Sequence, residues 1–311
     1  MDLRPLTAAD ILHNEKISTE GVLLGPITDP SIVLLHSKEG VGKTLFVHEV
    51  AYGIATGDCS FTRNPIPAWK PCTSPGDVLI VDGEMPLGAL KTRISEGARG
   101  RSLERVHIIS MMEHYNRTGE SIDISLPEHR TAIDKKLTSL KRPKLLILDN
   151  LTSLTGDTYS EDASADQRGL NNWFTSLREK GISVLLVHHD NKSGDQRGSS
   201  ARTAPVNLTI HLIKPPEIPV YEARYNVTFT KSRNAWPQPK PFALKYVNGV
   251  FAFRSYEDSR IDELLEIMEL TGKWSYRDVM VEMGLSRSRV FALRDETRRH
   301  GLWRKEWDKV D

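Results

Sequence analysis

The stretch VLLHSKEGVGKTLF, from Val33 to Phe46, decides how the rest of the chain is interpreted. It differs at one position from the phosphate-binding pattern G-x-x-x-x-G-K-[ST], because residue 37 is serine where the pattern has its first glycine. Gly40 and Gly42 are present, and they would let the backbone approach a phosphate closely. A buried strand before the loop and a helix after it supply the context that the pattern requires. We therefore interpret residues 37–45 as a variant nucleotide-binding loop.

The residue types in this loop indicate how it would act. Backbone N–H groups would point at phosphate oxygens, Lys43 would reach the β- and γ-phosphates of ATP, and Thr44 would hold Mg²⁺. The nucleotide is expected to contact the whole segment, which comprises Ser37, Lys38, Glu39, Gly40, Val41, Gly42, Lys43, Thr44 and Leu45. The sequence therefore predicts ATP and Mg²⁺ as cofactors.

Lys38 raises an alternative, because KEGVGKT is also close to K-G-G-x-G-K-T. That variant occurs in partitioning-type dimeric ATPases, in which the early lysine reaches the nucleotide of the partner subunit. Glu39 departs from the variant pattern, so the later motifs have to decide between the two interpretations.

Composition limits the class of protein. With 311 residues, 39% hydrophobic and 27% charged, the chain has room for one large α/β domain and a small appendage, and it is expected to be globular and soluble. Neither a bilayer-spanning apolar run nor the order of a secretory signal is present, so no membrane contact is predicted. Cys59 and Cys72 lack ligand or redox spacing, which favours the reducing cytoplasm. A net charge of +1 leaves nucleic-acid contact to local patches.

Apolar runs alternate with helical segments along most of the chain. Helices are predicted from Thr44 to Thr56, from Leu87 to Gly97 and from about Pro127 to Leu140, and an amphipathic segment opens the chain at Ala8–Lys16. The predicted buried strands are SIVLLHS (31–37), VLIVDGEMP (78–86), RVHIIS (105–110), KLLILDN (144–150) and ISVLLVHHD (182–190). Alternation of this kind predicts an α/β fold with a mainly parallel central sheet and helices on both faces. Ligands bind at the carboxyl ends of such strands.

The pattern changes from about Asn207. Four segments show the alternation of apolar and polar residues that is typical of antiparallel strands, and they are expected to close one side of the sheet. They are LTIHLIK (208–214), YNVTFTKSR (225–233), FALKYVNG (242–249) and VFAFRS (250–255). The residues after Ser255 read as three short helices, with Gly284 in the turn between the second and third. Trp303 is predicted to begin a short strand. We expect a boundary between residues 1–255 and a small domain at 256–311.

Polar side chains follow three of the buried strands. Asp149 is placed to hold the water shell of Mg²⁺, although many buried strands end in an aspartate that only begins a turn. Glu84 could polarise the water that attacks the γ-phosphate, and Asp82 is the rival carboxylate. A lone histidine is usually structural, whereas the pair His188 and His189 leads into a polar segment with Lys192, Gln196 and Arg197. This order is typical of a γ-phosphate sensor followed by a basic loop, which suits a DNA backbone.

Several motifs together give a specific resemblance. GEMPLGALKTRI, LLILDN, VHHDNKSGDQRGSSA and FTKSRN occur in the order seen in RecA-type hexameric helicases. The chain resembles the RepA family of plasmid replicative helicases over roughly Ile17 to Phe253, and is more distantly similar to DnaB-type helicases. Ser37 is the main departure. The partitioning-type alternative accounts for none of these later motifs.

The resemblance implies roles for individual residues. Lys43 and Thr44 would bind phosphate and Mg²⁺, Glu84 would be the catalytic base and Asp149 the metal carboxylate. His189 matches the sensor. Two further sets follow, a DNA-contacting loop and a pair that reaches into the ATP site of a neighbouring subunit. They comprise Arg197, Gly198, Ser199 and Ser200 for the loop, to which the basic segment adds Lys192, and Lys231 and Arg233 for the neighbouring site.

The C-terminal segment fits a helix-turn-helix of winged type. Its basic residues lie on or near the second helix of that motif: Arg287, Arg289, Arg294, Arg298 and Arg299. We expect Arg287 and Arg289 to contact DNA in a major groove. A solvated basic helix, or a docking module for a replication protein, is the alternative interpretation.

Taken together, the sequence predicts an ATP-driven homo-oligomer, expected to be a hexamer, that moves on single-stranded DNA. A replicative helicase of a plasmid, phage or mobile element fits best. One rival is an accessory ATPase that loads a helicase or remodels DNA. Another is a sequence-specific DNA-binding regulator in which the ATP site controls assembly.

Overall fold

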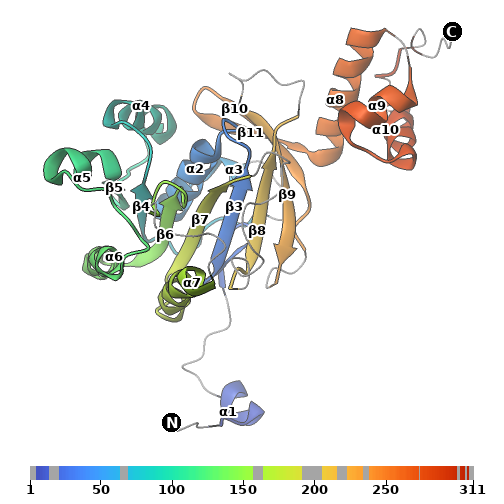
Figure 1. Cartoon of the computed structure of the whole chain (residues 1–311). Coiled ribbons are helices and arrows are strands. Elements are labelled where there is room, and N and C mark those ends of the chain that lie inside the picture. The colour runs from blue at the N-terminus through green and yellow to red at the C-terminus, as the bar shows by residue number, and fades with distance from the viewer. Residues whose placement is uncertain are drawn as a thin grey trace.

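A computed structural model of the chain describes residues 5–13, 21–63, 69–156, 164–190, 205–215, 223–233, 238–272, 274–299, 302–304 and 307. A nine-stranded sheet with the order β11-β10-β9-β8-β3-β7-β6-β4-β5 forms its centre (Figure 1). The strands are β3 (Ile32–Ser37), β4 (Asp77–Asp82), β5 (Val106–Ser110), β6 (Pro143–Asp149), β7 (Ser183–His189), β8 (Leu208–Ile213), β9 (Arg224–Ser232), β10 (Phe242–Val247) and β11 (Val250–Ser255).

The six strands from β8 to β5 in this order pair in parallel, and the remaining pairs are antiparallel. The predicted α/β fold with a mainly parallel sheet is therefore confirmed. One detail of the prediction was wrong: β8 pairs in parallel with β3, and only its other edge is antiparallel, to β9. Alternation of apolar residues gives a strand its two faces but not its direction, so the sequence pattern could not separate these cases.

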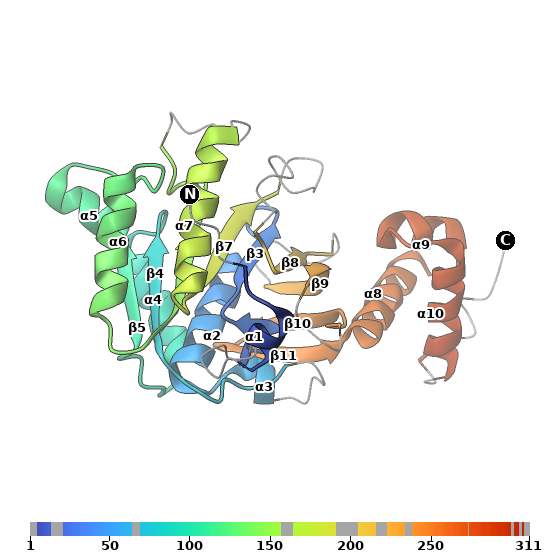
Figure 2. The same ribbon diagram turned by 90° about the horizontal axis from the view of Figure 1, so that it is seen from below.

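Helices cover both faces of the sheet (Figure 2). They are α2 (Lys43–Thr56), α3 (Ser60–Arg63), α4 (Leu87–Ala98), α5 (Met111–Thr118), α6 (Pro127–Ser139) and α7 (Ser164–Glu179). Successive residues of β3 point to opposite faces, because side chains alternate along a strand. Val33 and Leu35 join a core with α2, whereas Ile32 and Leu34 join a second core with α6 and α7. The sheet is thus buried on both sides, which holds the ends of its strands in fixed positions.

Several elements were not predicted. A two-stranded hairpin, β1 (Gly21–Leu24) and β2 (Ile27–Asp29), precedes β3, and the helices α3 and α5 follow α2 and β5. The opening helix α1 (Ala8–Leu12) is shorter than the predicted segment, whose remaining residues lie largely outside the described ranges. None of the five residues of α1 is buried.

The predicted C-terminal helices are α8 (Tyr256–Thr271), α9 (Tyr276–Met283) and α10 (Arg287–Arg299). They share a core of their own, and Gly284 ends α9 with a φ of 61°. α8 packs against β10 and β11, and Arg224 pairs with Glu266 at 3.0 Å. The prediction that Trp303 begins a strand was wrong, since residues 302–304 have no regular structure. The Trp303 ring instead packs edge-on against Trp274 and Trp307.

No helix within the described ranges is both long enough and apolar enough to cross a bilayer.

Candidate nucleotide-binding site

The phosphate loop connects the end of β3 to the start of α2. Gly40 and Gly42 have φ angles of 74° and 107°, a region that side chains with a Cβ rarely adopt. Ser37 is the last residue of β3, and its backbone is not among those with positive φ. Glycine is therefore needed at Gly40 and Gly42 but not at position 37. The Ser37 side chain is buried, and its hydroxyl donates to the carbonyl of Lys38 at 2.9 Å.

Lys43 is the buried cation of the site. Its ammonium donates to the carbonyls of Ser37 and Lys38 at 3.2 and 3.1 Å, and to the Ser37 hydroxyl at 3.3 Å. Burial lowers the pKa of Lys43, while the Asp149 carboxylate opposes that change. The loop carbonyls therefore hold the ammonium close to the place where the loop would receive phosphate.

Two carboxylates lie at the ends of neighbouring strands. Asp82 on β4 is paired in register with Asp149 on β6. Burial, and then the nearby Asp82, raise the pKa of Asp149 to about 7, although a hydrogen bond with Thr44 opposes the increase. Asp82 accepts hydrogen bonds from the backbone N–H groups of Glu84 and Met85 at 3.3 and 2.8 Å. Asp82 thus orders the turn that carries Glu84, which leaves Glu84 as the more available carboxylate.

Glu84 belongs to a hydrogen-bonded network at the carboxyl edge of the sheet. Its Oε1 accepts from Asn150 Nδ2 at 2.6 Å and from Ser153 Oγ at 2.9 Å, and it lies 3.7 Å from His189 Nε2. Burial alone would raise the pKa of Glu84, but the hydrogen bonds from Asn150 and Ser153, and then His189 and the charge of Lys43, lower it below its usual value. Glu84 is therefore ionised near neutral pH and able to accept a proton.

His189 joins this network to the phosphate loop. Its Nδ1 lies 3.0 Å from Lys43 Nζ, and its Nε2 lies 3.0 Å from Asn150 Nδ2. Burial, and then the charge of Lys43, lower the pKa of His189, so the ring is neutral. Lys43 Nζ and Asn150 Nδ2 are both donors, so the neutral ring accepts from one of them and carries its proton on the other nitrogen.

These side chains line one cavity of about 320 Å³. Most of the residues predicted for the nucleotide site are at its wall: Glu39, Gly40, Gly42, Lys43, Thr44, Leu45, Glu84, Asp149 and His189. Ser37 and Val41 are buried beneath the loop instead, and Lys38 contributes its carbonyl. The wall also contains residues to which sequence reasoning gave no role: Met85, Arg93, Asn150 and Ala223.

Asn150 and Arg93 are the missed residues with clear chemistry. Asn150 directly follows Asp149, and its position after a buried strand was the one signal that could have identified it. Arg93 is half-buried on α4 and lies close enough to Asp82 to counter the effect of burial on the pKa of that carboxyl. Nothing in the sequence identifies Arg93, because a single arginine on a helix does not belong to a spaced motif.

The remaining predicted residues lie elsewhere. Lys231 and Arg233 are near the end of β9, where the Arg233 N–H donates to the carbonyl of Asn207 and the Asn207 N–H donates to Ile32 at the beginning of β3. Lys231 and Arg233 therefore lie near the beginning of β3, whereas the phosphate loop follows its end. Arg287 and Arg289 are on α10. The predicted DNA loop, with Lys192, Arg197, Gly198, Ser199 and Ser200, lies outside the described residues.

The donor set of the cavity fits a magnesium nucleotide. A threonine hydroxyl hydrogen-bonded to a buried carboxyl group, with a second carboxylate near it, supplies the oxygen ligands that Mg²⁺ prefers. Thr44 and Asp149 would hold the ion, which when bound would neutralise charge on the phosphates. Lys43 would bind phosphate oxygens, and Glu84 would accept a proton from an attacking water.

Comparisons with known proteins agree with this geometry. The AAA domain family matches residues 2–195. A KaiC-like protein from the hyperthermophilic archaeon Pyrococcus horikoshii superimposes with a TM-score of 0.52 and 14% identity, covering 73% of this chain and 91% of that protein. The ATPase domain of G40P gives 0.50 and 11%, covering 73% and 85%. No curated protein matches the sequence. The chain therefore belongs to the AAA domain family and has the RecA-like fold of a P-loop ATPase.

Proposed function

We propose that the chain is an ATP- and Mg²⁺-driven motor on single-stranded DNA, acting as a replicative helicase of a plasmid, phage or mobile element. One observation carries the proposal: the end of β7 joins the ATP site to a basic segment. His189 contacts Lys43 and faces Glu84, and the residues that follow include Lys192 and Arg197. A group that senses the γ-phosphate and leads directly into a basic segment supports coupling between hydrolysis and DNA contact.

Assembly into a ring, expected to be a hexamer, is part of the proposal. Lys231 and Arg233 lie near each other, since the charge of Arg233 contributes to the lowered pKa of Lys231 after burial does. Neither residue lines the cavity of its own subunit, so their predicted role requires the ATP site of a neighbour. The exposed apolar side chains in and near α1, Leu6, Ile11 and Leu12, also favour contact with another chain.

Residues 256–311 are proposed to form a separate winged-helix-like domain that binds duplex DNA or a replication protein. The core shared by α8, α9 and α10 supports a unit of its own. Arg287 and Arg289 remain the predicted DNA contacts. The cytoplasm remains the expected setting, which the free, buried Cys59 and Cys72 support.

The test is an ATPase and strand-displacement assay of the full chain with Mg²⁺. We expect hydrolysis to depend on Lys43, to increase with single-stranded DNA and to displace a strand from a forked duplex. Replacing Lys192 and Arg197 with alanine should weaken single-strand affinity about equally across sequences and reduce its salt dependence. Hydrolysis that DNA stimulates without strand displacement would favour a helicase loader or remodeller. A sequence-specific footprint on duplex DNA, without either activity, would favour the regulator.

A further inference from the structure

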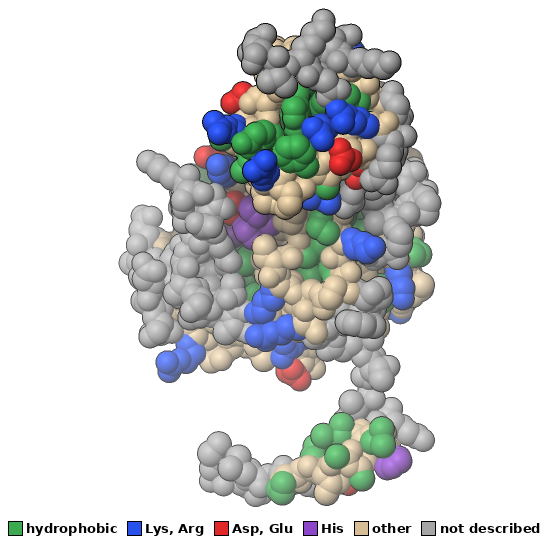
Figure 3. All heavy atoms as spheres, turned by 90° about the vertical axis from the view of Figure 1, so that its right-hand side faces the viewer, with side chains coloured by type: hydrophobic (Ala, Val, Ile, Leu, Met, Phe, Trp, Pro, Cys, Tyr) green, Lys and Arg blue, Asp and Glu red, His purple; other side chains and the backbone are tan. Residues whose placement is uncertain are grey.

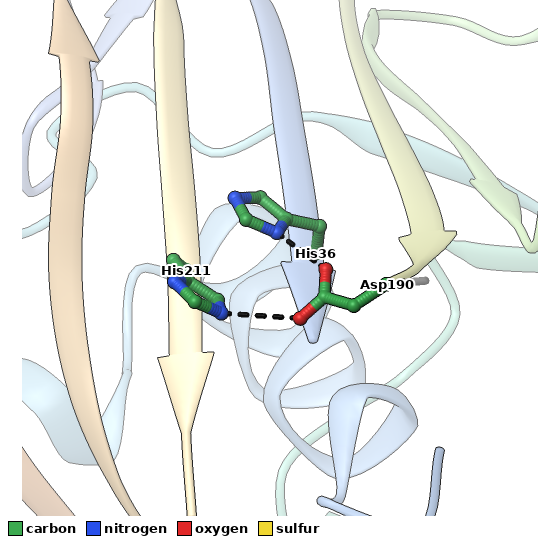
Figure 4. A group of neighbouring side chains, drawn as sticks. All are labelled: His36, Asp190 and His211. Atoms are coloured by element: carbon green, nitrogen blue, oxygen red, sulfur yellow. Dashed lines mark hydrogen bonds and ion pairs between the residues drawn. The ribbon is translucent and has the colours of Figure 1, made fainter. Parts of the chain in front are cut away.

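Three polar side chains meet beside the nucleotide site without lining its cavity (Figure 4). His36 Nδ1 lies 2.6 Å from one carboxylate oxygen of Asp190, and His211 Nε2 lies 3.1 Å from the other. His36 and His211 are partners in the register of β3 and β8, and Asp190 directly follows β7. His36, Asp190 and His211, here called the triad, thus connect the carboxyl ends of three neighbouring strands. The proposed chemistry gives no role to any of them.

The distances define which ring nitrogen acts in each contact. A neutral imidazole has one N–H donor, and an ionised carboxylate only accepts. His36 therefore donates from Nδ1 and His211 donates from Nε2, and the carboxylate of Asp190, whose side chain is 0% exposed, has a partner on each oxygen. The two rings stack with centroids 4.2 Å apart and an interplanar angle of 13°. A buried carboxylate held in this way has little freedom to move.

The same side chains could be considered as metal ligands, since their donor atoms lie within 4.8 Å of one another. Ligands at about 2.0–2.2 Å from a tetrahedral zinc ion would stand roughly 3.3–3.5 Å from each other. The separation of 2.6 Å between His36 and Asp190 is too short for that arrangement and matches a hydrogen bond to a charged group. The geometry therefore favours a hydrogen-bonded triad.

The triad is one residue away from two groups that contact Lys43. Ser37 follows His36, and its carbonyl accepts from both Lys43 Nζ and the backbone N–H of Asp190. His189 precedes Asp190, and its Nδ1 lies 3.0 Å from Lys43 Nζ. Ser37 and His189 are themselves register partners in β3 and β7. Fixing Asp190 therefore fixes the carbonyl and the imidazole between which the Lys43 ammonium lies.

We propose that Asp190, held by His36 and His211, is a positioning residue for ATP hydrolysis. It keeps His189 aligned with Lys43 and with Glu84, whose Oε1 lies 3.7 Å from His189 Nε2. The phosphate loop binds ATP through its own backbone and Lys43, so loss of a triad hydrogen bond lowers turnover more than it weakens ATP binding. This inference rests on the proposed ATPase function.

Amide side chains provide a matched test. Glutamine places its amide nitrogen near the position of imidazole Nε2, and asparagine places it near that of Nδ1. His211→Gln should therefore retain kcat, whereas His211→Asn should lower it by about tenfold or more, because small misalignments of reacting groups are costly. At His36 the order should reverse, with Asn retained and Gln impaired. The KM for ATP should stay within about twofold of wild type in all four variants that fold, as judged by Tm.

Each outcome has a defined meaning. Equal kcat within both pairs, with only Tm changed, would overturn the inference and leave a structural role. Loss of activity in all four variants together with loss of Zn²⁺ copurifying with wild type would also overturn it, in favour of a metal site. Wild type and Lys43→Ala are assayed alongside. If wild type showed no Lys43-dependent hydrolysis, the proposed function itself would fail, and this inference with it.

Discussion

At the entrance of the phosphate loop, Ser37 has its side chain buried and its carbonyl facing Lys43. The backbone there continues β3, so a Cβ is accommodated without strain, unlike at Gly40 and Gly42. We predict that Ser37→Gly retains ATP hydrolysis, whereas Lys43→Ala abolishes it because no other described ammonium lines the cavity. Steady-state hydrolysis with Mg²⁺ measures both. Full activity in Lys43→Ala would mean that ATP is hydrolysed elsewhere.

The two carboxylates at the end of β4, Asp82 and Glu84, have different surroundings, which separates their roles. Glu84 Oε1 accepts from side chains in the cavity, whereas Asp82 accepts from backbone N–H groups. Glu84→Gln should bind ATP but hydrolyse it at least ~10²-fold more slowly, as expected for loss of a general base. Asp82→Asn should have a much smaller effect. Single-turnover hydrolysis and nucleotide binding distinguish them, and a reversed order would transfer the role of base to Asp82.

Asp149 should make the stability of the protein without Mg²⁺ depend on pH. Its pKa is raised from 3.8 in the unfolded chain to about 7 by burial and by Asp82. The contribution of Asp149 to stability is then fully present below pH 3.8 and is lost as pH rises through about 7, because the folded state has to bury the charge. Each unit of difference between the pKa values in the folded and unfolded chain corresponds to about 1.4 kcal/mol of folding free energy.

Asp149→Asn removes that charge and should raise Tm by several degrees at pH 8 in the presence of a chelator. At pH 5 the gain should be smaller, since most of the wild-type protein keeps Asp149 neutral there. Added Mg²⁺ and ADP should stabilise wild type more than the variant. A gain in Tm that did not change between pH 5 and pH 8 would contradict the assigned pKa.

At this scale the sequence predicted the residues that belong to a spaced motif. Glu39, Lys43, Thr44, Glu84, Asp149 and His189 all line the cavity. Asn150 and the triad were not predicted, because their roles arise from the pairing of strands that are distant in sequence. His36 and His211 become neighbours only through the register of β3 with β8.

Among the elements, strands and helices with strong periodicity could be predicted closely, and pairing could not. The predicted helix at 44–56 is α2, and the predicted helix at 127–140 is α6. The predicted direction of β8 was wrong, because β8 pairs with β3 rather than with β7, the strand that precedes it in the chain. Strand direction is a property of the chain path rather than of local composition.

Helix α10 presents arginines that rest on aromatic rings. Figure 3 looks onto the right-hand side of Figure 1, and its upper part shows apolar side chains bordered by Lys and Arg. The Arg287 guanidinium lies 4.9 Å from the ring centroid of Tyr276, and that of Arg294 lies 4.7 Å from that of Phe291. Arg298 lies 5.4 Å from Trp303. Cation–π contacts of this kind hold the guanidinium groups in place on the surface of this helix.

We predict that replacing Arg287 and Arg298 with alanine weakens duplex DNA binding and reduces its salt slope by about 2, one unit for each phosphate that an arginine no longer neutralises. ATP hydrolysis without DNA should not change, because neither residue lines the ATP cavity. The matched control replaces two exposed lysines near the other end of the sheet, Lys135 and Lys141, which removes the same charge. Equal weakening in both variants would indicate a general charge effect, and unchanged binding in both would favour a docking role for this unit.

For the molecule as a whole, the separation of Arg233 from the phosphate loop has the largest consequence. The end of β9 is linked through Asn207 to the beginning of β3, whereas the phosphate loop follows the end of β3. One subunit therefore has its nucleotide site and the Lys231 and Arg233 pair at opposite ends of neighbouring strands. In a ring of identical subunits, the Lys231 and Arg233 pair of one subunit would face the nucleotide site of the next subunit at each interface.

Mixing two inactive variants tests this arrangement. Arg233→Ala subunits keep an intact phosphate loop, and Lys43→Ala subunits keep an intact Arg233, so each should be nearly inactive alone. An arginine that stabilises transition-state charge from a neighbouring subunit is worth ~10³-fold or more in rate. Some interfaces in a mixed assembly would pair an intact loop with an intact Arg233, and ATPase activity should return to a fraction set by the mixing ratio.

The control replaces Arg277, an exposed arginine on α9, with alanine, and this variant should be active without mixing. If Arg233 were an ordinary surface cation, its exposed pairing would be worth about 0–1 kcal/mol, and Arg233→Ala would retain most of its activity alone. If Arg233 acted within its own subunit, the mixture would stay as inactive as its components even with co-assembly shown by pull-down. Recovery on mixing would require that two chains contribute to each ATP site, because neither variant carries both groups in one subunit.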